Sequence, residues 1–334
     1  MGFEITFIPG SQELEISQFI QKHVFAKNDF IVNSSGSTGN PKSFKFSYFN
    51  AKISAEKTIK FFNIDDTKSI YVCLDINTIA TKMSIFRAYF ANCKLICGPV
   101  QSFPFFENTS INFDFISLVP LQVSKILSTN KNLLDNSTVL LGGAKPSKKT
   151  IDLIQKNGIN AFETYGMTET LSHVALKYLK DKNTIFQALD GIRFSLDNRS
   201  CLNISYPELL SEKIITNDIV DLIDEQSFIW KGRFDFIINS GGKKIIPEMI
   251  EQKISENLRR EVVLTKVEDQ FLGEKLVLLI EGEEIEVSKD IFSEFHKYQI
   301  PKLYAFVDEF ERVNSKIKRI SINNASNYEW REVL

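Results

Sequence analysis

Hydrophobic residues follow two alternating spacings in the first half of the chain. Short apolar runs such as SIYVCL (69–74) and STVLLGGA (137–144) are bounded by Gly and polar residues, which predicts strands. Between such runs, segments 47–64, 78–93 and 146–158 carry apolar residues at helical spacing, and the last of them begins with Pro-Ser and ends in Gly. This alternation predicts an α/β fold with a mostly parallel sheet flanked by helices.

The pattern changes at about residue 184. Three strand-like runs with turn residues between them predict a small β-rich subdomain, at 191–206, 213–223 and 227–238. A helix, two strands and a second helix are then predicted in a small α+β arrangement, at 248–258, 260–269, 275–284 and 289–298. We therefore expect an N-terminal domain over 1–234 and a C-terminal domain over 235–334.

Composition and charge exclude several classes of protein. The chain has 334 residues, 43% of them hydrophobic and 25% charged, with a formal net charge of -2, which is typical of a globular protein and gives no basic excess for nucleic acid. Four cysteines without a CxxC pair predict buried, reduced thiols in a cytoplasmic protein, and three scattered histidines argue against a metal cluster.

The N-terminal sequence and the apolar runs give no sign of membrane insertion. We expect no signal peptide, because no basic stretch precedes an apolar core, and no apolar run approaches the ~18 residues that span a bilayer. MGFEIT fits the loose myristoylation pattern, but FEITFI (3–8) also fits a first strand, which we prefer. A homodimer is left open.

NSSGSTGNPKS (33–43) follows a short predicted strand and is the first candidate for chemistry. Its glycines permit backbone conformations that other residues avoid, its backbone amides and hydroxyls can donate hydrogen bonds to an anion, and Lys42 adds a positive charge. Pro41 stands where a Walker loop has its second glycine, and no clear helix start follows Lys42. A kinase-type loop is disfavoured, whereas a Ser/Gly linker and another kind of phosphate loop both remain open.

TYGMTETLSHVALK (164–177) follows a predicted strand, at the end where open α/β sheets bind ligands. Tyr165 suits stacking on a flat ring, Gly166 gives clearance, Thr168 offers a hydroxyl, and Glu169 is a hard oxygen ligand for Mg²⁺. A turn entering a helix is the alternative. Two later stretches complete the candidates: WKGRFDFIINSGGKKIIPEMIE (230–251) and the basic VNSKIKR (313–319).

In this order, the four stretches resemble the adenylate-forming superfamily, which comprises acyl-CoA synthetases, luciferases and peptide-synthetase adenylation domains. SSGSTGNPK resembles the family's phosphate loop, in which the proline is expected, and TYGMTE resembles its Tyr-Gly-x-Thr-Glu motif. GRFDFIINSGGKKIIPEMIE is similar to its hinge, and NSKIKR to its Asn-Gly-Lys-[IV]-x-Arg motif with Ser315 in place of Gly. The short region before the phosphate loop resembles the branch that activates o-succinylbenzoate.

The resemblance implies a two-step reaction in which a carboxylic acid and ATP form acyl-AMP, and coenzyme A then takes the acyl group. Mg²⁺ would accompany ATP, and a mobile C-terminal domain would rotate about Asp235. The resemblance implies that the β- and γ-phosphates of ATP are bound by Ser35, Gly36, Ser37, Thr38, Gly39 and Lys42, and that adenine and the α-phosphate are contacted by Gly143, Ala144, Thr164, Tyr165, Gly166 and Thr168. It implies that Glu169 binds Mg²⁺ and that Asp218, with Arg233 nearby, binds the ribose. It also implies an acyl pocket at Ser172 and His173, a coenzyme A site beside Gly241, Gly242 and Lys243, and catalysis by Lys316.

Alternatives accompany these roles. In the alternative interpretation, Lys316 is a solvated surface lysine and His173 is a structural histidine. Lys318 is the second candidate for the catalytic lysine. The alternative substrate is another aryl or small carboxylic acid, and a carrier protein is the alternative acceptor of the acyl group. A non-catalytic nucleotide-binding protein is the competing class, and intact Lys42, Glu169 and Lys316 argue against it.

Overall fold

The computed structural model describes residues 2–33, 42–105, 112–180, 184–313, 316–319 and 328–333. The chain divides into two compact units. The first contains residues 1–195, 204–214 and 223–228, and the second contains residues 196–203, 215–222 and 229–334. The boundary that the sequence suggested, near Asp235, stays a prediction.

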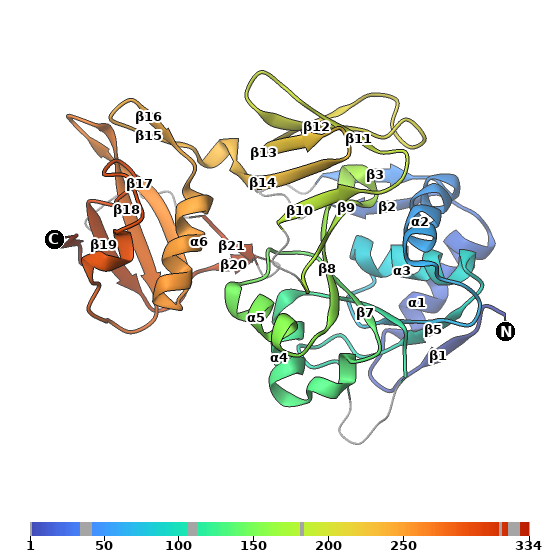
Figure 1. The fold of residues 1–334 in the computed structure, drawn as a ribbon. Coiled ribbons are helices and arrows are strands. Elements are labelled where there is room, and N and C mark those ends of the chain that lie inside the picture. Colours follow the sequence, from blue (N-terminus) through green and yellow to red (C-terminus); the bar gives the residue numbers. More distant parts are fainter. Residues whose placement is uncertain are drawn as a thin grey trace. The chain divides into compact units, whose positions relative to one another are not determined.

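Parallel strands form the centre of the first unit (Figure 1). Each adjacent pair in the order β1-β5-β4-β6-β7-β8 is parallel, as the alternation of strands and helices predicted. The strands are β1 (Ile5–Phe7), β5 (Lys94–Cys97), β4 (Ser69–Val72), β6 (Phe115–Leu118), β7 (Thr138–Leu141) and β8 (Asn160–Met167).

Helices cover both faces of these strands (Figure 1). On β6, Ile116 belongs to the core cluster with Val123 and Ile154, whereas Phe115 points to the other face and meets the ring of Phe62 at 5.3 Å. The N-termini of several helices are capped by side chains that accept hydrogen bonds from backbone amides of the first turn, at Ser47, Thr78 and Ser147. The helices are α2 (Tyr48–Phe62) and α3 (Ile79–Phe90) on one face, and α4 (Pro120–Thr129) and α5 (Lys148–Lys156) on the other.

Apart from β2, the short strand that was predicted before NSSGSTGNPKS, the other elements of the first unit were not evident in the sequence. Helix α1 (Glu13–Phe19) continues into a π-helical turn, η1 (Ile20–Phe25). Strands β9 (Ser172–Tyr178) and β10 (Ile185–Ala188) extend the sheet in antiparallel fashion beyond β8. A separate antiparallel hairpin is formed by β2 (Phe30–Asn33) and β3 (Ser43–Phe46).

The β-rich segment lies where the sequence placed it. Its strands pair in the order β14-β13-β12-β11, and the division between the two units runs through them. The strands are β11 (Arg193–Leu196), β12 (Cys201–Ser205), β13 (Ile214–Asp224) and β14 (Ser227–Arg233).

The rest of the second unit is a mixed sheet covered by helix α6 (Pro247–Leu258). The strand order is β16-β15-β18-β19-β22, and β17 pairs with the other edge of β18. Ile250 and Ile254 of α6 pack against Leu264 and Leu278. The strands are β15 (Ile238–Ser240), β16 (Lys243–Ile245), β17 (Val262–Asp269), β18 (Gly273–Glu281), β19 (Leu303–Val307) and β22 (Arg331–Glu332), and the short pair β20 (Arg312–Val313) and β21 (Lys316–Ile317) lies outside this sheet.

The predicted helix over 289–298 is wrong, because only a 3-10 turn, η5 (Lys289–Phe292), forms there. Ser293 Oγ donates to the carbonyl of Asp290, and the amide of His296 donates to Gln299 Oε1. Such local side-chain bonds offer the backbone an alternative to the helical ladder. The turn still buries Phe292 in the core of this unit, which is the contact that the apolar spacing encoded.

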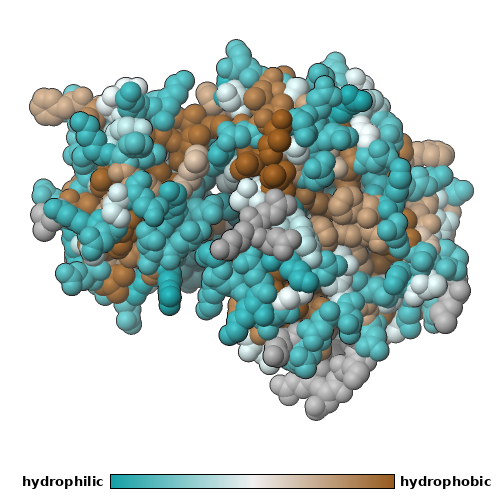
Figure 2. Space-filling view, viewed as in Figure 1, coloured by the Kyte–Doolittle hydropathy of each residue, from teal (hydrophilic) through white to brown (hydrophobic). Residues whose placement is uncertain are grey.

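The four cysteines are buried and free, in agreement with the sequence prediction. None of the helices within the described ranges is long and apolar enough to cross a membrane. The face of each unit shown in Figure 2 is covered largely by hydrophilic side chains.

Candidate active site

The ends of three parallel strands bring the predicted adenine-binding residues together. Strands β6, β7 and β8 are adjacent and parallel, so the residues that follow each strand meet at one edge of the sheet. Thr164 Oγ1 donates to the carbonyl of Leu141 at 2.9 Å and ties β8 to the end of β7. Gly143 has a φ of +84°, and a Cβ there would lie 3.3 Å from Val119, so this turn favours glycine.

Tyr165, on β8, contacts the aromatic rings of Phe186 and Phe228, which belong to other strands. Its ring centroid lies 5.0 Å from that of Phe228 at an interplanar angle of 75°, and 5.8 Å from that of Phe186. Edge-to-face contacts of this kind favour one ring orientation. A fixed, half-buried ring suits the stacking role that the motif suggested.

The turn after β8 is tight and leads into a strand, not the alternative helix. The register shifts between Tyr165 and Gly166, where a Cβ would lie 2.2 Å from the carbonyl oxygen of Ser172. Leu171 has a φ of +56° and Ser172 a φ of +152°, both rare for residues with side chains. This strained turn carries Thr168 and Glu169, both half-buried, in the 3-10 segment η3 (Thr168–Thr170).

Ser172 and His173 start β9 and lie almost fully inside the first unit. His173 Nε2 lies 3.0 Å from Thr58 Oγ1, and Nδ1 lies 3.3 Å from Ser172 Oγ. Burial, followed by the positive charge of Arg87, holds the pKa of His173 well below its ordinary value. The imidazole is therefore neutral near pH 7 and acts as a hydrogen-bonding group.

The candidate phosphate loop connects the two strands of the β2–β3 hairpin. Ser35, Gly36, Ser37, Thr38 and Gly39 lie outside the described residues. The loop's base is closed by the pair Asn33 and Ser43, whose side chains share a 2.8 Å hydrogen bond. Lys42 is exposed directly before β3. A strand follows this lysine where a Walker loop needs a helix, so the sequence argument against a Walker loop is confirmed.

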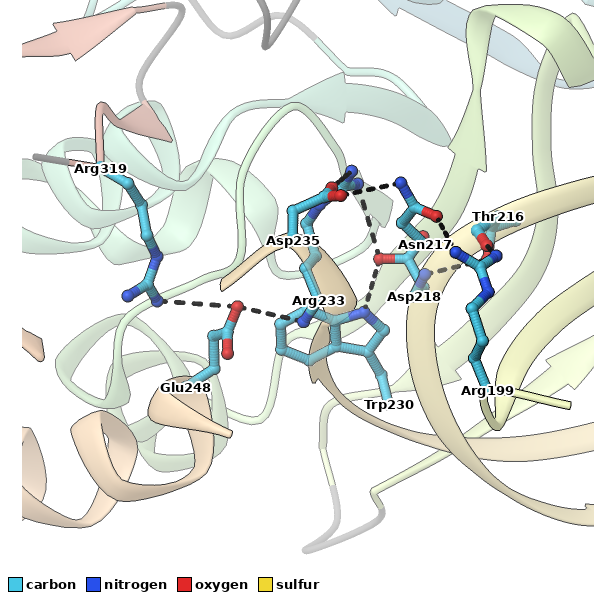
Figure 3. Close-up of polar contacts among 9 residues, drawn as sticks. All are labelled: Arg199, Thr216, Asn217, Asp218, Trp230, Arg233, Asp235, Glu248 and Arg319. Carbon is cyan, nitrogen blue, oxygen red and sulfur yellow. Dashed lines mark hydrogen bonds and ion pairs between the residues drawn. The ribbon is translucent and has the colours of Figure 1, made fainter. Parts of the chain in front are cut away.

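The second unit joins three of the predicted residues in one polar network (Figure 3). Asp218 on β13 is buried; it accepts a 3.1 Å hydrogen bond from Trp230 Nε1 and lies 3.8 Å from Arg233 Nη1. Arg233 also binds Asp235 at 2.5 Å, and Asn217 Nδ2 donates to that carboxylate at 2.9 Å. The candidate ribose and hinge positions are thus linked through Arg233.

Glu248 and Arg319 extend this network and were missed by the sequence reasoning. The amide of Arg233 donates to Glu248 Oε1 at 3.1 Å, and Arg319 Nη2 lies 3.7 Å from the same oxygen (Figure 3). Arg319 also forms two 2.6 Å hydrogen bonds with Glu251. Burial raises the pKa of Glu248 to about 6. Arg319 ends the NSKIKR motif, but nothing in the sequence near Glu248 indicated this contact.

The hairpin turn and the lysine motif lie elsewhere in the second unit. Gly241 and Gly242 have φ values of +56° and +74° between β15 and β16, so both positions suit glycine, and Lys243 follows them exposed. Lys316 lies in β21, where its backbone pairs with Val313. The fallback residue, Lys318, binds the carboxylate of Glu311 at 2.9 Å.

The described residues hold no group of three or more His, Cys, Asp or Glu side chains that could bind a metal on their own. Glu169 offers a single half-buried carboxylate. One carboxylate is compatible with Mg²⁺, which keeps waters and takes most of its remaining ligands from substrate phosphates. The site fits a metal that arrives with a nucleotide.

Residues 12–194 match the family described as AMP-binding enzyme. Among curated proteins, the chain is 28% identical over 295 residues to a 2-succinylbenzoate–CoA ligase of Haemophilus influenzae, covering 81% of this chain and 63% of that protein. It is 23% identical to the enzyme of that name from Escherichia coli, covering 80% and 62%. The chain thus spans less than two thirds of the length of these relatives.

Solved structures show the same fold. An acyl-CoA synthetase (AMP-forming)/AMP-acid ligase II-like protein from Dyadobacter fermentans superposes with a TM-score of 0.62 at 32% identity, over 90% of each chain. An o-succinylbenzoate coenzyme A synthetase from Bacillus subtilis, in complex with ATP and a magnesium ion, gives a TM-score of 0.72 at 18% identity, over 86% of this chain and 68% of that one. The family match covers more than half of the chain and the motifs agree with it, so this chain belongs to the AMP-binding enzymes, the adenylate-forming family that its motifs indicated.

Proposed function

We propose that this protein is an ATP-dependent acid–CoA ligase that forms acyl-AMP and then acyl-CoA. The observation that carries this proposal is the meeting of the motif residues around Gly143, Tyr165 and Glu169 at adjacent strand ends of an AMP-binding fold. We propose o-succinylbenzoate as the acid, and menaquinone biosynthesis as the role, because curated relatives over 81% and 80% of the chain are 2-succinylbenzoate–CoA ligases.

The first half-reaction joins two anions, so it needs positive charge and oriented donors. In this proposal Lys42 and the loop residues Ser35 to Gly39 hold the β- and γ-phosphates, and Thr168 contacts the α-phosphate. Lys316 bridges the attacking carboxylate and the α-phosphate and offsets the charge that builds up between them. The neutral polar residues Ser172 and His173 line the acyl pocket.

Nucleotide recognition is assigned to the remaining motif residues. The fixed ring of Tyr165 and the Gly143–Ala144 turn flank adenine, and Gly166 permits the close approach of β9 to β8 next to Tyr165. Asp218 accepts the ribose hydroxyls, and Trp230 and Arg233 hold its carboxylate in place. Glu169 would hold Mg²⁺, which supplies charge neutralisation at the phosphates.

The second half-reaction delivers the acyl group to the thiol of coenzyme A. Asp235 is the proposed hinge, about which the C-terminal residues rotate between the two steps. The exposed turn of Gly241, Gly242 and Lys243 then lies on the coenzyme A side. Its paired glycines permit close approach of a ligand to the backbone.

ATP–pyrophosphate exchange over a panel of acids tests the proposal. We expect exchange that depends on o-succinylbenzoate, and release of AMP once coenzyme A is added. Exchange with a different aryl or aliphatic acid alone would replace the substrate and keep the reaction class. ATP binding without exchange for any acid would indicate a non-catalytic nucleotide-binding protein.

A further inference from the structure

The short hairpin that carries Lys316 is fastened to the second unit on both sides. Its strands, β20 and β21, pair Val313 with Lys316 and lie outside the main sheet of this unit. Ile317, the residue after Lys316, packs against a buried apolar cluster formed by Val263, Leu279, Ala305 and Phe310. An arginine begins the hairpin and a second one follows its end, and each binds a carboxylate through two hydrogen bonds.

Arg312 anchors the start of the hairpin to β18. Its Nη2 donates to Oε1 and Oε2 of Glu281, the last residue of β18, at 3.0 and 2.8 Å. Its Nη1 donates to the carbonyl of Phe310 at 3.1 Å, and the amide of Phe310 donates to Glu281 Oε2 at 2.8 Å. One carboxylate of the main sheet thus holds both the arginine and the backbone that leads into the hairpin.

Arg319 anchors the other end to α6 and β17. It donates one 2.6 Å hydrogen bond to each oxygen of Glu251, and a further bond of 3.2 Å to the carbonyl of Leu264. The amide of Leu264 donates in turn to Glu251 Oε1 at 2.7 Å. The guanidinium also lies 4.8 Å from the ring centroid of Phe236, which follows the proposed hinge Asp235. This anchor therefore connects the lysine segment to the hinge segment.

A third ion pair at the base of the same hairpin is of a different kind. Lys318 binds Glu311 at 2.9 Å, and their side chains are 59% and 64% exposed. The side chains of Arg319 and Glu251 are only 20% and 13% exposed. Exposed ion pairs contribute little, whereas an arginine that binds both oxygens of a carboxylate away from solvent fixes the geometry of the two groups. The arginine pairs, more than the lysine pair, can hold the backbone at Lys316.

We propose that Arg312 and Arg319 are positioning residues that hold Lys316 for the adenylation step. The inference rests on the proposed function and deepens it, since it names the groups that place the proposed catalytic lysine. A lysine has a long, flexible side chain, so it stabilises a transition state well only if the backbone that carries it is fixed. The two arginines act through the backbone of the hairpin and have no role in contacting the substrate.

Separate measurement of the two half-reactions tests this role. ATP–pyrophosphate exchange reports adenylation, and formation of acyl-CoA from supplied acyl-AMP reports the second step. Arg312→Met and Arg319→Met should each lower the kcat of exchange by about 30-fold, with the KM for ATP changed by less than about 3-fold, because the catalytic group is displaced while the nucleotide contacts remain. Acyl-CoA formation should change by less than about 3-fold.

The partner carboxylate provides a second test of the same contact. Glu251→Gln should reproduce most of the loss seen in Arg319→Met, and the double variant should lose no more than Arg319→Met alone, because both substitutions break one interaction. Arg319→Lys keeps the charge but not the paired bonds, and it should recover part of the rate. Glu311→Gln is the matched control on the same hairpin, and it should change the kcat of exchange by less than about 2-fold.

The outcomes separate positioning from a general effect on stability. Equal losses in both half-reactions, or unchanged exchange in the arginine variants, would overturn the inference. If the methionine variants do not fold, Arg319→Lys and Glu251→Gln carry the same comparison of half-reactions. Absence of exchange by the unmodified protein with every acid would instead refute the proposed function, and this inference with it.

Discussion

Gly166 shows how a single position shapes the site. A Cβ there would lie 2.2 Å from the carbonyl oxygen of Ser172 and 2.5 Å from the Cα of His173, and both are backbone atoms that cannot move aside cheaply. Gly166→Ala should therefore destabilise the protein by about 3 kcal/mol through overpacking. Thermal denaturation checks this expectation.

Gly158→Ala is the control for that substitution. Gly158 also has a positive φ, +66°, but a Cβ there would meet nothing within 4 Å. Only the conformational cost of about 1 kcal/mol is then expected. Equal losses of stability in the two variants would contradict the close contact at Gly166.

Asp218 and Trp230 give a prediction for nucleotide binding. Trp230→Phe removes the 3.1 Å hydrogen bond that orients the Asp218 carboxylate, so the KM for ATP should rise about 5-fold, with the KM for the acid nearly unchanged. Asp221→Asn is the control: it lies on the same strand, is exposed, and pairs with Lys231. A Trp230→Phe variant with an unchanged KM for ATP would remove Asp218 from the proposed ribose site.

At the residue scale, the motifs identified the candidates but not their partners. The sequence singled out Tyr165, Asp218 and Arg233, but their contacts with Phe228, Trp230 and Glu248 form only in the folded chain. Arg87 lies in a helix whose apolar spacing predicted only a core-facing element.

At the scale of elements, Glu248 connects the start of α6 to the hinge segment. Its Oε1 accepts from the amide of Arg233, and its Oε2 lies so close to Gly232 that a Cβ there would be 2.5 Å away. Burial raises its pKa from 4.5 to about 6, so the folded state favours the protonated form. The stabilising contribution of the proton is present below about pH 4.5 and is lost as the pH rises through 6.

Glu248→Gln keeps the shape of the protonated acid and removes its titration. Relative to this variant, the unmodified protein should lose roughly 2 kcal/mol of unfolding free energy between pH 4.5 and pH 7, as measured by urea denaturation. Glu256→Gln on the same helix is the control, since Glu256 accepts a hydrogen bond at 3.2 Å from Gln252 Nε2, one helical turn away on α6. A constant difference across this pH range would show that Glu248 is not desolvated.

The elements themselves were largely predictable. Parallel strands and helices alternate with clear spacing from residue 47 to residue 167, and the chain folds accordingly. Strand β9 was less evident, because apolar residues in TLSHVALK fit both a strand and a helix. The expected helix at 289–298 failed because side-chain hydrogen bonds at Ser293 and His296 compete with its first turns.

At the scale of the whole molecule, Lys316 is proposed to act in the first half-reaction, adenylation, and not in the second. Lys316→Ala should slow adenylation by about 100-fold or more, because it removes charge stabilisation from the transition state, and should largely spare thioester formation from supplied acyl-AMP. Lys318→Ala is the control, since Lys318 already binds Glu311 at 2.9 Å. If Lys318→Ala gave this split and Lys316→Ala did not, the catalytic assignment would move to Lys318.

In the proposed reaction, one chain makes an acyl-adenylate and then passes the acyl group to coenzyme A. A single-turnover reaction with ATP, Mg²⁺ and o-succinylbenzoate, quenched and analysed by mass spectrometry, tests it most directly. We expect acyl-AMP and pyrophosphate before coenzyme A is added, and acyl-CoA with AMP afterwards. Release of ADP and phosphate, or no acyl-AMP despite bound ATP, would contradict it.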